Sequence, residues 1–225
     1  MKAPMVKYGR FRLAKLHTPA YAHLKLLLGW PVYFALYFLT ENLIPAENCT
    51  PIHIVLDDWI PFFEWFVIPY VFWYGLIVFS LGYFLFYDVD NFRRLQIYFF
   101  VTQLLATAIY ILFPSRQDLR PTAFLRDNVL VDSVRFLYSI DTNTGVCPSL
   151  HVAGSMGILS AWFGRKATPL WGRMFIVITV VLICLSTMFI KQHSAADFFA
   201  ALPVCLVAEI ISYGWVSRHP YQISA

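Results

Sequence analysis

Two polar clusters in the last third of the chain hold the residue types that could do chemistry. The first is Cys147-Pro148-Ser149-Leu150-His151, and the second ends in Lys191-Gln192-His193-Ser194-Ala195-Ala196-Asp197. Two long apolar runs, joined by a short basic connection at 164–173, separate them. Because two membrane crossings return a chain to the side it left, we expect both clusters and the upstream Arg120-Pro121 pair to meet at one interface. This combination of Arg, Lys, His, Ser and Asp suits attack on a phosphate ester.

His193 and Asp197 are the candidate nucleophile and its orienting partner. They are four residues apart, so they share a face if the segment is helical. The carboxylate can accept a hydrogen bond from one ring nitrogen and leave the other ready to act as a nucleophile. A charged residue just inside an apolar span is costly and is therefore a functional candidate. Taken alone, the pair could equally be a structural contact between helices.

The segment from Pro148 to His151 predicts the start of a helix. Proline suits the first helical position, and the free N–H groups of that turn, with the Ser149 hydroxyl, predict an anion site. His151 would then donate a proton to a departing alkoxide. Taken alone, these residues are an ordinary helix cap.

Arg120 and Lys191 are candidate phosphate ligands. Arg120 would offer a bidentate fork and Lys191 a point charge. The alternatives are a solvated loop arginine and an interfacial lysine whose ammonium group reaches water.

The composition is that of a membrane protein. Of 225 residues, 59% are hydrophobic, 18% are aromatic and only 13% are charged, whereas soluble domains average roughly 25% charged. The net charge is +4 without a dense basic patch, which argues against nucleic-acid binding. Cys184 and Cys205 lie in apolar runs and are expected to be packing residues. Cys49 and Cys147 fall in loops on one side, so a disulfide between them is conceivable.

The hydrophobic pattern predicts an all-α integral membrane protein with one domain, 1–225. A basic cytoplasmic segment at 1–23 leads into a six-helix bundle at 24–216, and a short cytoplasmic tail follows at 217–225. Residues 88–94 are expected to form an exposed connection, and 124–140 a short amphipathic helix on the membrane surface between spans three and four. The predicted spans are about 24–44, 61–87, 95–113, 148–163, 170–190 and 195–216.

Charge predicts the orientation of these spans. With the N-terminus inside, the inner loops and ends carry 12 of the 17 Lys and Arg residues and the outer loops carry 5. This distribution obeys the positive-inside rule. Both termini are therefore expected on the cytoplasmic side, and the two polar clusters on the extracytoplasmic side.

Together the clusters resemble the type-2 phosphatidic acid phosphatase superfamily, which includes lipid phosphatases, undecaprenyl pyrophosphate phosphatases, and sphingomyelin and inositol-phosphorylceramide synthases. Three positions depart from its signatures: Phe113 replaces a Lys, Leu150 a Gly and Thr187 an Arg. Two expected cations are thus missing, and Lys191 and Arg116 are the nearby replacements. Over about residues 95–215, the signatures K-x6-R-P, P-S-G-H and S-R-x5-H-x3-D appear as Arg120-Pro121, Pro148-Ser149-Leu150-His151, and Ser186-Thr187 followed by His193 and Asp197.

The resemblance implies a role for each matched residue. His193 would attack phosphorus to form a phosphohistidine, Asp197 would orient it, and His151 would protonate the leaving group. The substrate would be a phospholipid or a polyprenyl phosphate in the bilayer, and neither a metal nor another cofactor is implied. The oligomeric state stays open. The residues that would hold the phosphate are Arg120, Ser149 and Ser186.

Three alternatives remain beside a phosphatase. Leu150 and Thr187 resemble the inositol-phosphorylceramide synthase branch, so phosphate could pass to an alcohol instead of water. The missing cations fit an inactive relative that only binds lipid phosphate. A transporter could use His193 and Asp197 as a proton relay, but neither broken helices nor paired halves are visible in the sequence.

Overall fold

The computed structural model of this chain describes residues 4–221. Residues 1–3 of the predicted basic segment and residues 222–225 of the predicted tail lie outside this range. The described part is helical apart from two very short strands, β1 (Thr50–Pro51) and β2 (Ser115–Arg116). Its α-helices are α1 (Gly29–Leu43), α2 (Val55–Trp59), α3 (Val67–Tyr87), α4 (Val89–Leu112), α5 (Val129–Ile140), α6 (Leu150–Gly164), α7 (Leu170–Phe189) and α8 (Ala195–Arg218).

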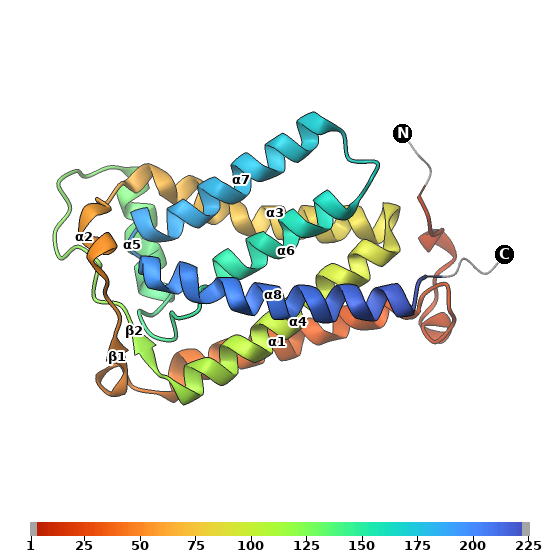
Figure 1. The fold of residues 1–225 in the computed structure, drawn as a ribbon, viewed down its shortest axis with the longest axis horizontal. Coiled ribbons are helices and arrows are strands. Elements are labelled where there is room, and N and C mark those ends of the chain that lie inside the picture. The colour runs from red at the N-terminus through yellow and green to blue at the C-terminus, as the bar shows by residue number, and fades with distance from the viewer. Residues whose placement is uncertain (1–3, 222–225) are drawn as a thin grey trace.

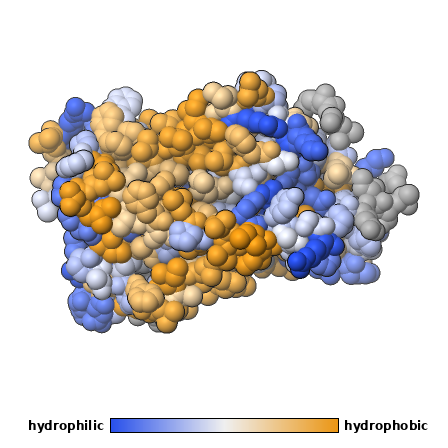
Figure 2. All heavy atoms as spheres, in the orientation of Figure 1, coloured by the Kyte–Doolittle hydropathy of each residue, from blue (hydrophilic) through white to orange (hydrophobic). Residues whose placement is uncertain are grey.

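Five helical segments are long and apolar enough to cross a membrane, which supports an integral membrane protein. They are Ala22–Thr40, Glu64–Tyr87, Val89–Leu112, Leu170–Phe189 and Ala195–Arg218. Apolar side chains cover the middle of the face seen in Figure 2, and polar ones gather toward its ends. The predicted span at 148–163 corresponds to α6, whose 15 residues fall short of the roughly 20 that cross a hydrocarbon core.

The predicted exposed connection at 88–94 is wrong, because α4 already begins at Val89. The Asp88 carboxylate accepts a hydrogen bond from the Asn91 N–H at 3.2 Å and so caps the first turn. Val89 and Phe92 are fully buried, and Arg94 is paired with Glu209 of α8. The polar residues of this stretch therefore form the capped start of α4, and Arg94 makes its ion pair within the bundle.

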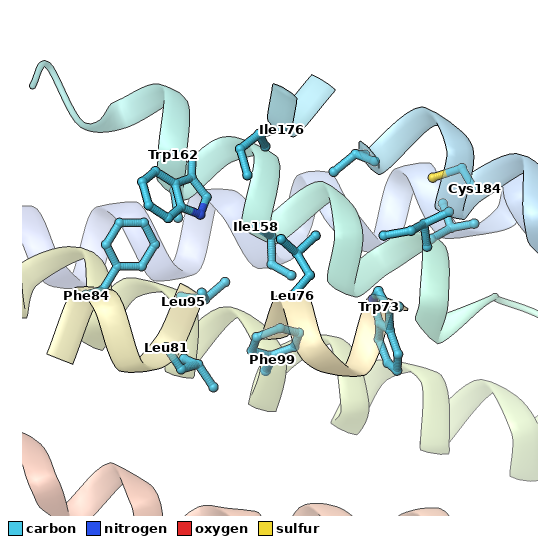
Figure 3. Close-up of a cluster of buried hydrophobic side chains, with 14 of the residues drawn as sticks. Trp73, Leu76, Leu81, Phe84, Leu95, Phe99, Ile158, Trp162, Ile176 and Cys184 are labelled. Atoms are coloured by element: carbon cyan, nitrogen blue, oxygen red, sulfur yellow. The ribbon is translucent and has the colours of Figure 1, made fainter. Parts of the chain in front are cut away.

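The core lies among α3, α4, α6 and α7. Figure 3 shows its large side chains meeting from these four helices. Two glycines of α6 permit the close approach, because a Cβ at Gly157 would lie 2.4 Å from the Tyr98 ring and one at Gly154 would lie 2.9 Å from Trp73. The labelled core residues are Trp73, Leu76, Leu81, Phe84, Leu95, Phe99, Ile158, Trp162, Ile176 and Cys184.

The loops gather at one end of the bundle, opposite the end where the described chain begins and finishes (Figure 1). There β1 pairs in parallel with β2, which joins the segment after α1 to the segment after α4. A further antiparallel bridge links Arg116 to Thr144. The predicted helix at 124–140 is present as α5, five residues shorter at its start, and its Val134 and Leu137 pack against Tyr70 and Ile190.

The Cys49–Cys147 disulfide that the sequence allowed does not form, since both cysteines are free. The Cys147 N–H instead donates to the Ser115 hydroxyl at 3.2 Å, and the Cys49 thiol lies 3.6 Å from the Pro45 carbonyl oxygen. Cys49 is thus held within its own loop, and Cys147 is held against β2.

Candidate functional site

His193 and Asp197 are in direct contact at the loop end of the bundle. His193 Nδ1 lies 3.1 Å from Asp197 Oδ2. The prediction that they share a helix face is corrected in detail, because α8 begins at Ala195 and Ser194 is its N-cap. Asp197 is the third residue of that helix, and its carboxylate also accepts the Ser194 N–H at 3.0 Å. A capping box, rather than a continuous helix, therefore holds the pair together.

The surroundings of His193 fix which ring nitrogen carries the proton. Nδ1 lies 3.1 Å from the Val146 carbonyl oxygen and 3.1 Å from the Asp197 carboxylate. Both groups are acceptors only, so Nδ1 must be the donor. In the neutral ring the lone pair is then on Nε2, which is the nitrogen that a nucleophilic histidine needs.

His151 lies next to His193 and packs against two aromatic side chains. Its ring stacks on Tyr70 at 4.2 Å between centroids and lies tilted against Trp73 at 4.1 Å. The His151 and His193 rings are 6.2 Å apart. His151 Nε2 is buried and has no hydrogen-bond partner among the described residues. A substrate phosphate and its leaving oxygen would provide that partner.

Ser149 joins the start of α6, which carries His151, to the start of α8, which carries Asp197. It is the N-cap of α6, and its hydroxyl accepts the Val152 N–H at 3.4 Å, while its own N–H donates to the Asp197 carbonyl oxygen at 3.2 Å. Pro148 therefore precedes the helix instead of occupying its first position. With Ser149 fully buried in the cap, the anion site predicted here rests on the N–H groups of the α6 first turn.

Arg120 reaches the same end of the bundle from the loop before α5. Its guanidinium donates to the carbonyl oxygens of Tyr138, Asp141 and Thr142 at 3.3, 2.9 and 2.8 Å. It also donates to Gln192 Oε1 at 2.5 Å, directly beside His193. Arg120 thus holds the end of α5 and brings a permanent positive charge to the residue that precedes the nucleophile.

Asp141 collects hydrogen bonds from three separate parts of the chain. Its carboxylate accepts from Tyr37 of α1 at 3.0 Å, from Tyr70 of α3 at 3.3 Å and from the Gln192 amide at 3.1 Å. The Asp141 carboxylate therefore positions Tyr70, on which His151 stacks. It also positions Gln192, which directly precedes His193.

Lys191 is committed to a structural contact with α2. Its ammonium donates to the carbonyl oxygens of Asp57, at 3.1 Å, and of Ile60. Asp57 in turn accepts from the Ser194 hydroxyl at 2.5 Å and from the Ala195 N–H at 2.7 Å. Burial lowers the pKa of Lys191, and the Asp57 and Asp58 charges oppose that shift. Lys191 and Asp57 therefore clamp α2 onto the start of α8.

The other predicted ligands point to partners of their own. Ser186 donates to the Ile183 carbonyl oxygen at 2.6 Å, and Thr187 to that of Cys184 at 2.8 Å, so both hydroxyls bond back within α7. Arg116 binds Asp118 at 3.1 Å and the Ala46 carbonyl oxygen at 2.7 Å. Phe113 is an exposed side chain at the end of α4. The structure thus gathers His193, Asp197, His151, Ser149 and Arg120, and places Lys191, Ser186 and Arg116 in structural contacts with other groups.

Cys147 adds a buried thiol beside the pair. Burial, followed by the neighbouring Asp197 carboxylate, raises the pKa of Cys147 to about 12. A thiol of that pKa is protonated at neutral pH and is a poor nucleophile, so Cys147 is a weaker candidate nucleophile than His193.

Three contributors to the site were missed by sequence reasoning: Asp57, Asp141 and Gln192. Asp57 lies in a loop that holds three acids and no Lys or Arg, and this imbalance was the available signal. For Asp141 and Gln192 the sequence offers no such signal, because the partners are far apart in the chain. Asp141 is 71 residues from Tyr70 and 51 residues from Gln192.

Nothing in the described part of the chain gathers three or more His, Cys, Asp or Glu side chains in a way that could hold a metal ion. The chemistry available is that of the two histidines, the carboxylate and the arginine described above. Comparisons with protein-family models, curated proteins and solved structures find no match to this chain.

Proposed function

We propose that this protein is a membrane lipid phosphatase that works through a phosphohistidine at His193. The observation that supports it most is the fixed tautomer of His193. Its Nδ1 is held between the Asp197 carboxylate and the Val146 carbonyl, which leaves the Nε2 lone pair for attack. The second histidine, with its ring 6.2 Å away, is close enough for one phosphate to lie between them.

The reaction has two steps. Nε2 of His193 attacks phosphorus, an N–P bond forms, and the P–O bond to the lipid alcohol breaks as His151 gives its proton to the departing oxygen. Asp197 stabilises the ring cation that forms on His193. Water then attacks phosphorus, His151 takes a proton from that water, and the N–P bond breaks to release phosphate. Protons balance over the cycle because His151 is an acid first and a base second.

Charge on the transferring phosphoryl group is stabilised from two directions in this proposal. The N–H groups of the first turn of α6 point to the end where His151 lies, and a helix N-terminus favours an anion. Arg120 supplies a fixed positive charge beside His193 through Gln192. Arg120 is the cation that the matched signatures retain, and the Lys and Arg absent at Phe113 and Thr187 are not replaced in this arrangement, because Lys191 and Arg116 have other partners.

We further propose six crossings, with α6 as the short fourth one. Its polar start at 147–149 and the loop end of α7 and α8 lie on the extracytoplasmic side, and α5 lies along the membrane surface there. In support, α5 buries Val131, Val134 and Leu137 and exposes Phe136 and Ile140. The substrate is then a phosphomonoester or diphosphate lipid of the outer leaflet.

The test is trapping of the covalent intermediate. Purified wild-type protein with a ³²P-labelled phospholipid should carry acid-labile, alkali-stable label on quenching, and should release phosphate without added metal. His193→Ala should do neither, and Asp197→Asn should slow release by about 10²-fold or more because the tautomer is less well fixed. Asp58→Asn, on the exposed face of α2, is the matched control. Equal release by the wild type and His193→Ala would overturn the assignment.

A phosphotransferase that uses the same intermediate is the second candidate. Leu150 and Thr187 favour it, because Leu after Pro-Ser and Thr after Ser resemble the branch that contains the inositol-phosphorylceramide synthases. Adding free inositol or another polyol to half of the assays decides between them. Transfer to the polyol with little free phosphate identifies the transferase, and label that is bound but never turned over identifies an inactive lipid-phosphate binder.

A further inference from the structure

An apolar groove of about 320 Å³ runs down the outer face of the bundle from the loop end. Its walls belong to α7 and α8, and its floor to α6. These two wall helices pack on α6 and barely touch each other, and in Figure 1 they lie on either side of α6. The lining is wholly apolar: Leu56, Met156, Leu159, Val177, Val180, Val181, Cys184, Leu185, Met188, Ala195, Phe198 and Phe199.

The groove opens toward the space that a bilayer would fill. Both wall helices are long and apolar enough to cross a membrane. Val181 and Phe199 at the rim are 50% and 53% exposed, whereas Val180 and Cys184, deeper on the α7 wall, are buried. It is thus a recess in the lipid-facing surface, and only a hydrocarbon chain suits a recess without polar groups.

The end of the groove nearest the loops lies beside the candidate site. Ala195 lies between His193 and Asp197 in the sequence, and its N–H is held by Asp57. On the floor, Met156 is five residues beyond His151 on the same helix. Along the chain, this end of the groove is therefore close to His193, Asp197 and His151.

Along its α7 wall, the length of the groove matches one leaflet. Its lining on α7 runs from Met188 near the site to Val177, eleven residues further from it. At a rise of about 1.5 Å per residue this is about 16 Å, and half of a hydrocarbon core is about 15 Å. One extended chain of a lipid in the leaflet next to the site would reach from end to end.

From this geometry we propose that the groove holds one hydrocarbon chain of the lipid whose phosphate reacts at His193. The inference rests on the proposed function and adds the binding site for the apolar part of the substrate. Because lipid tails are as apolar as the groove, the chain gains little hydrophobic free energy on leaving the bilayer. Its role is to orient the headgroup, so that the phosphate approaches Nε2 in line.

Photolabelling tests this without turnover. His193→Ala protein in phosphatidylcholine vesicles receives a phosphatidic acid that bears a diazirine either near the ester end or at the tip of one chain. A polyprenyl phosphate with the same group serves as a second probe. We expect the ester-end probe to label Met188 or Phe199 and the chain-tip probe to label Val177, with label displaced by unlabelled phosphatidic acid or polyprenyl phosphate.

Groove-filling variants give the matched comparison. Val181→Trp blocks the middle of the groove and should reduce the displaceable label at least fivefold. Leu182→Trp, an equally apolar change on the neighbouring residue outside the lining, should leave it unchanged. Labelling by either probe in this depth order supports the proposal and shows which chain type fits.

Label spread evenly over exposed positions such as Ile178 and Val71, or label that excess lipid does not displace, would overturn the groove as a binding site. That failure is separate from failure of the proposed function, because phosphohistidine trapping on the wild type reports on chemistry and photolabelling of His193→Ala reports on binding alone.

Discussion

At the scale of single residues, the two histidines are set up for different tasks. His193 is held through Nδ1 by two acceptors, whereas His151 is held by ring stacking on Tyr70 and Trp73 and keeps Nε2 without a protein partner. A hydrogen bond fixes a tautomer, whereas stacking fixes only the plane of the ring. This difference suits a nucleophile beside an acid–base group.

The pH dependence of the rate follows from these two roles. In the proposed mechanism His193 must be neutral to attack phosphorus, and loss of that form lowers the rate toward acid. His151 must carry the proton that it gives to the departing alkoxide, and loss of that proton lowers the rate toward alkali. We expect a bell-shaped profile of kcat/KM for phosphate release. His151→Gln should be slower overall and should lack the alkaline limb. A rate that rises without limit toward alkaline pH in the wild type would contradict this pairing.

Cys147 provides a second pH-dependent observable. With a pKa of about 12, the thiol should react slowly with maleimide in the folded protein at pH 7–8, because the thiolate is the reactive form. In the unfolded chain the thiol has an ordinary pKa, near 9. The folded state therefore binds more protons between about pH 9 and 12, and stability falls as pH rises through that window. Mass spectrometry after timed labelling measures the first effect and denaturant titration the second.

At the scale of elements, the clamp between α2 and the start of α8 is the most direct support of the site. The Asp57 carboxylate accepts hydrogen bonds from Ser194, Ala195 and the Ile54 N–H. Asp57→Asn cannot accept all three, so we expect a loss of about 1–3 kcal/mol in stability and a lower kcat with little change in KM. Asp58→Asn is the control, since its pair with His53 is exposed and contributes little. Equal kcat in the two variants would show that the clamp does not position His193.

The packing of α6 against α4 depends on Gly157. A Cβ at this position would lie 2.4 Å from the ring of Tyr98, so Gly157→Ala should destabilise the protein by about 1–3 kcal/mol. Gly82 of α3 has open space where a Cβ would lie, and Gly82→Ala should be neutral or stabilise by up to about 1 kcal/mol. Thermal unfolding of the two variants in detergent gives the comparison; if both behaved alike, close packing would not be the reason for Gly157.

The sequence predicted the elements and contacts that depend on residues close together in the chain, and it did not predict those that depend on distant residues. Hydropathy located the apolar helices, and the spacing of His193 and Asp197 predicted their contact, because both signals are local. The start of α4 was misplaced because Arg94 has its partner on α8, and charge alone suggested a loop. The roles of Asp57 and Asp141 could not be predicted, since they come from contacts between segments that are far apart in the chain.

At the scale of the whole molecule, the two ends of the bundle carry different parts of the chain. The loop end holds the candidate site with β1, β2 and α5, and the described chain begins and finishes at the other end (Figure 1). If the N-terminus is cytoplasmic, a cysteine introduced at the exposed position Leu125 should react with an impermeant maleimide from outside intact cells. A cysteine at the exposed position Lys166 should react only after permeabilisation. The reverse pattern would place the site in the cytoplasm.

The long reach of the Asp57 and Asp141 contacts has a consequence for biosynthesis. Asp57 binds residues 137 and 138 positions later in the chain, and Asp141 joins Tyr37 to Gln192. An insertion machinery that releases helices in order has nearly finished α7 before Lys191 and Gln192 emerge. Until those residues have been made, Asp57 lacks Ser194 and Ala195, and Asp141 lacks Gln192. Completion of the candidate site is therefore a late event: a ribosome stalled before α8 leaves a chain in which α1 to α7 have been made and Asp197 is still missing.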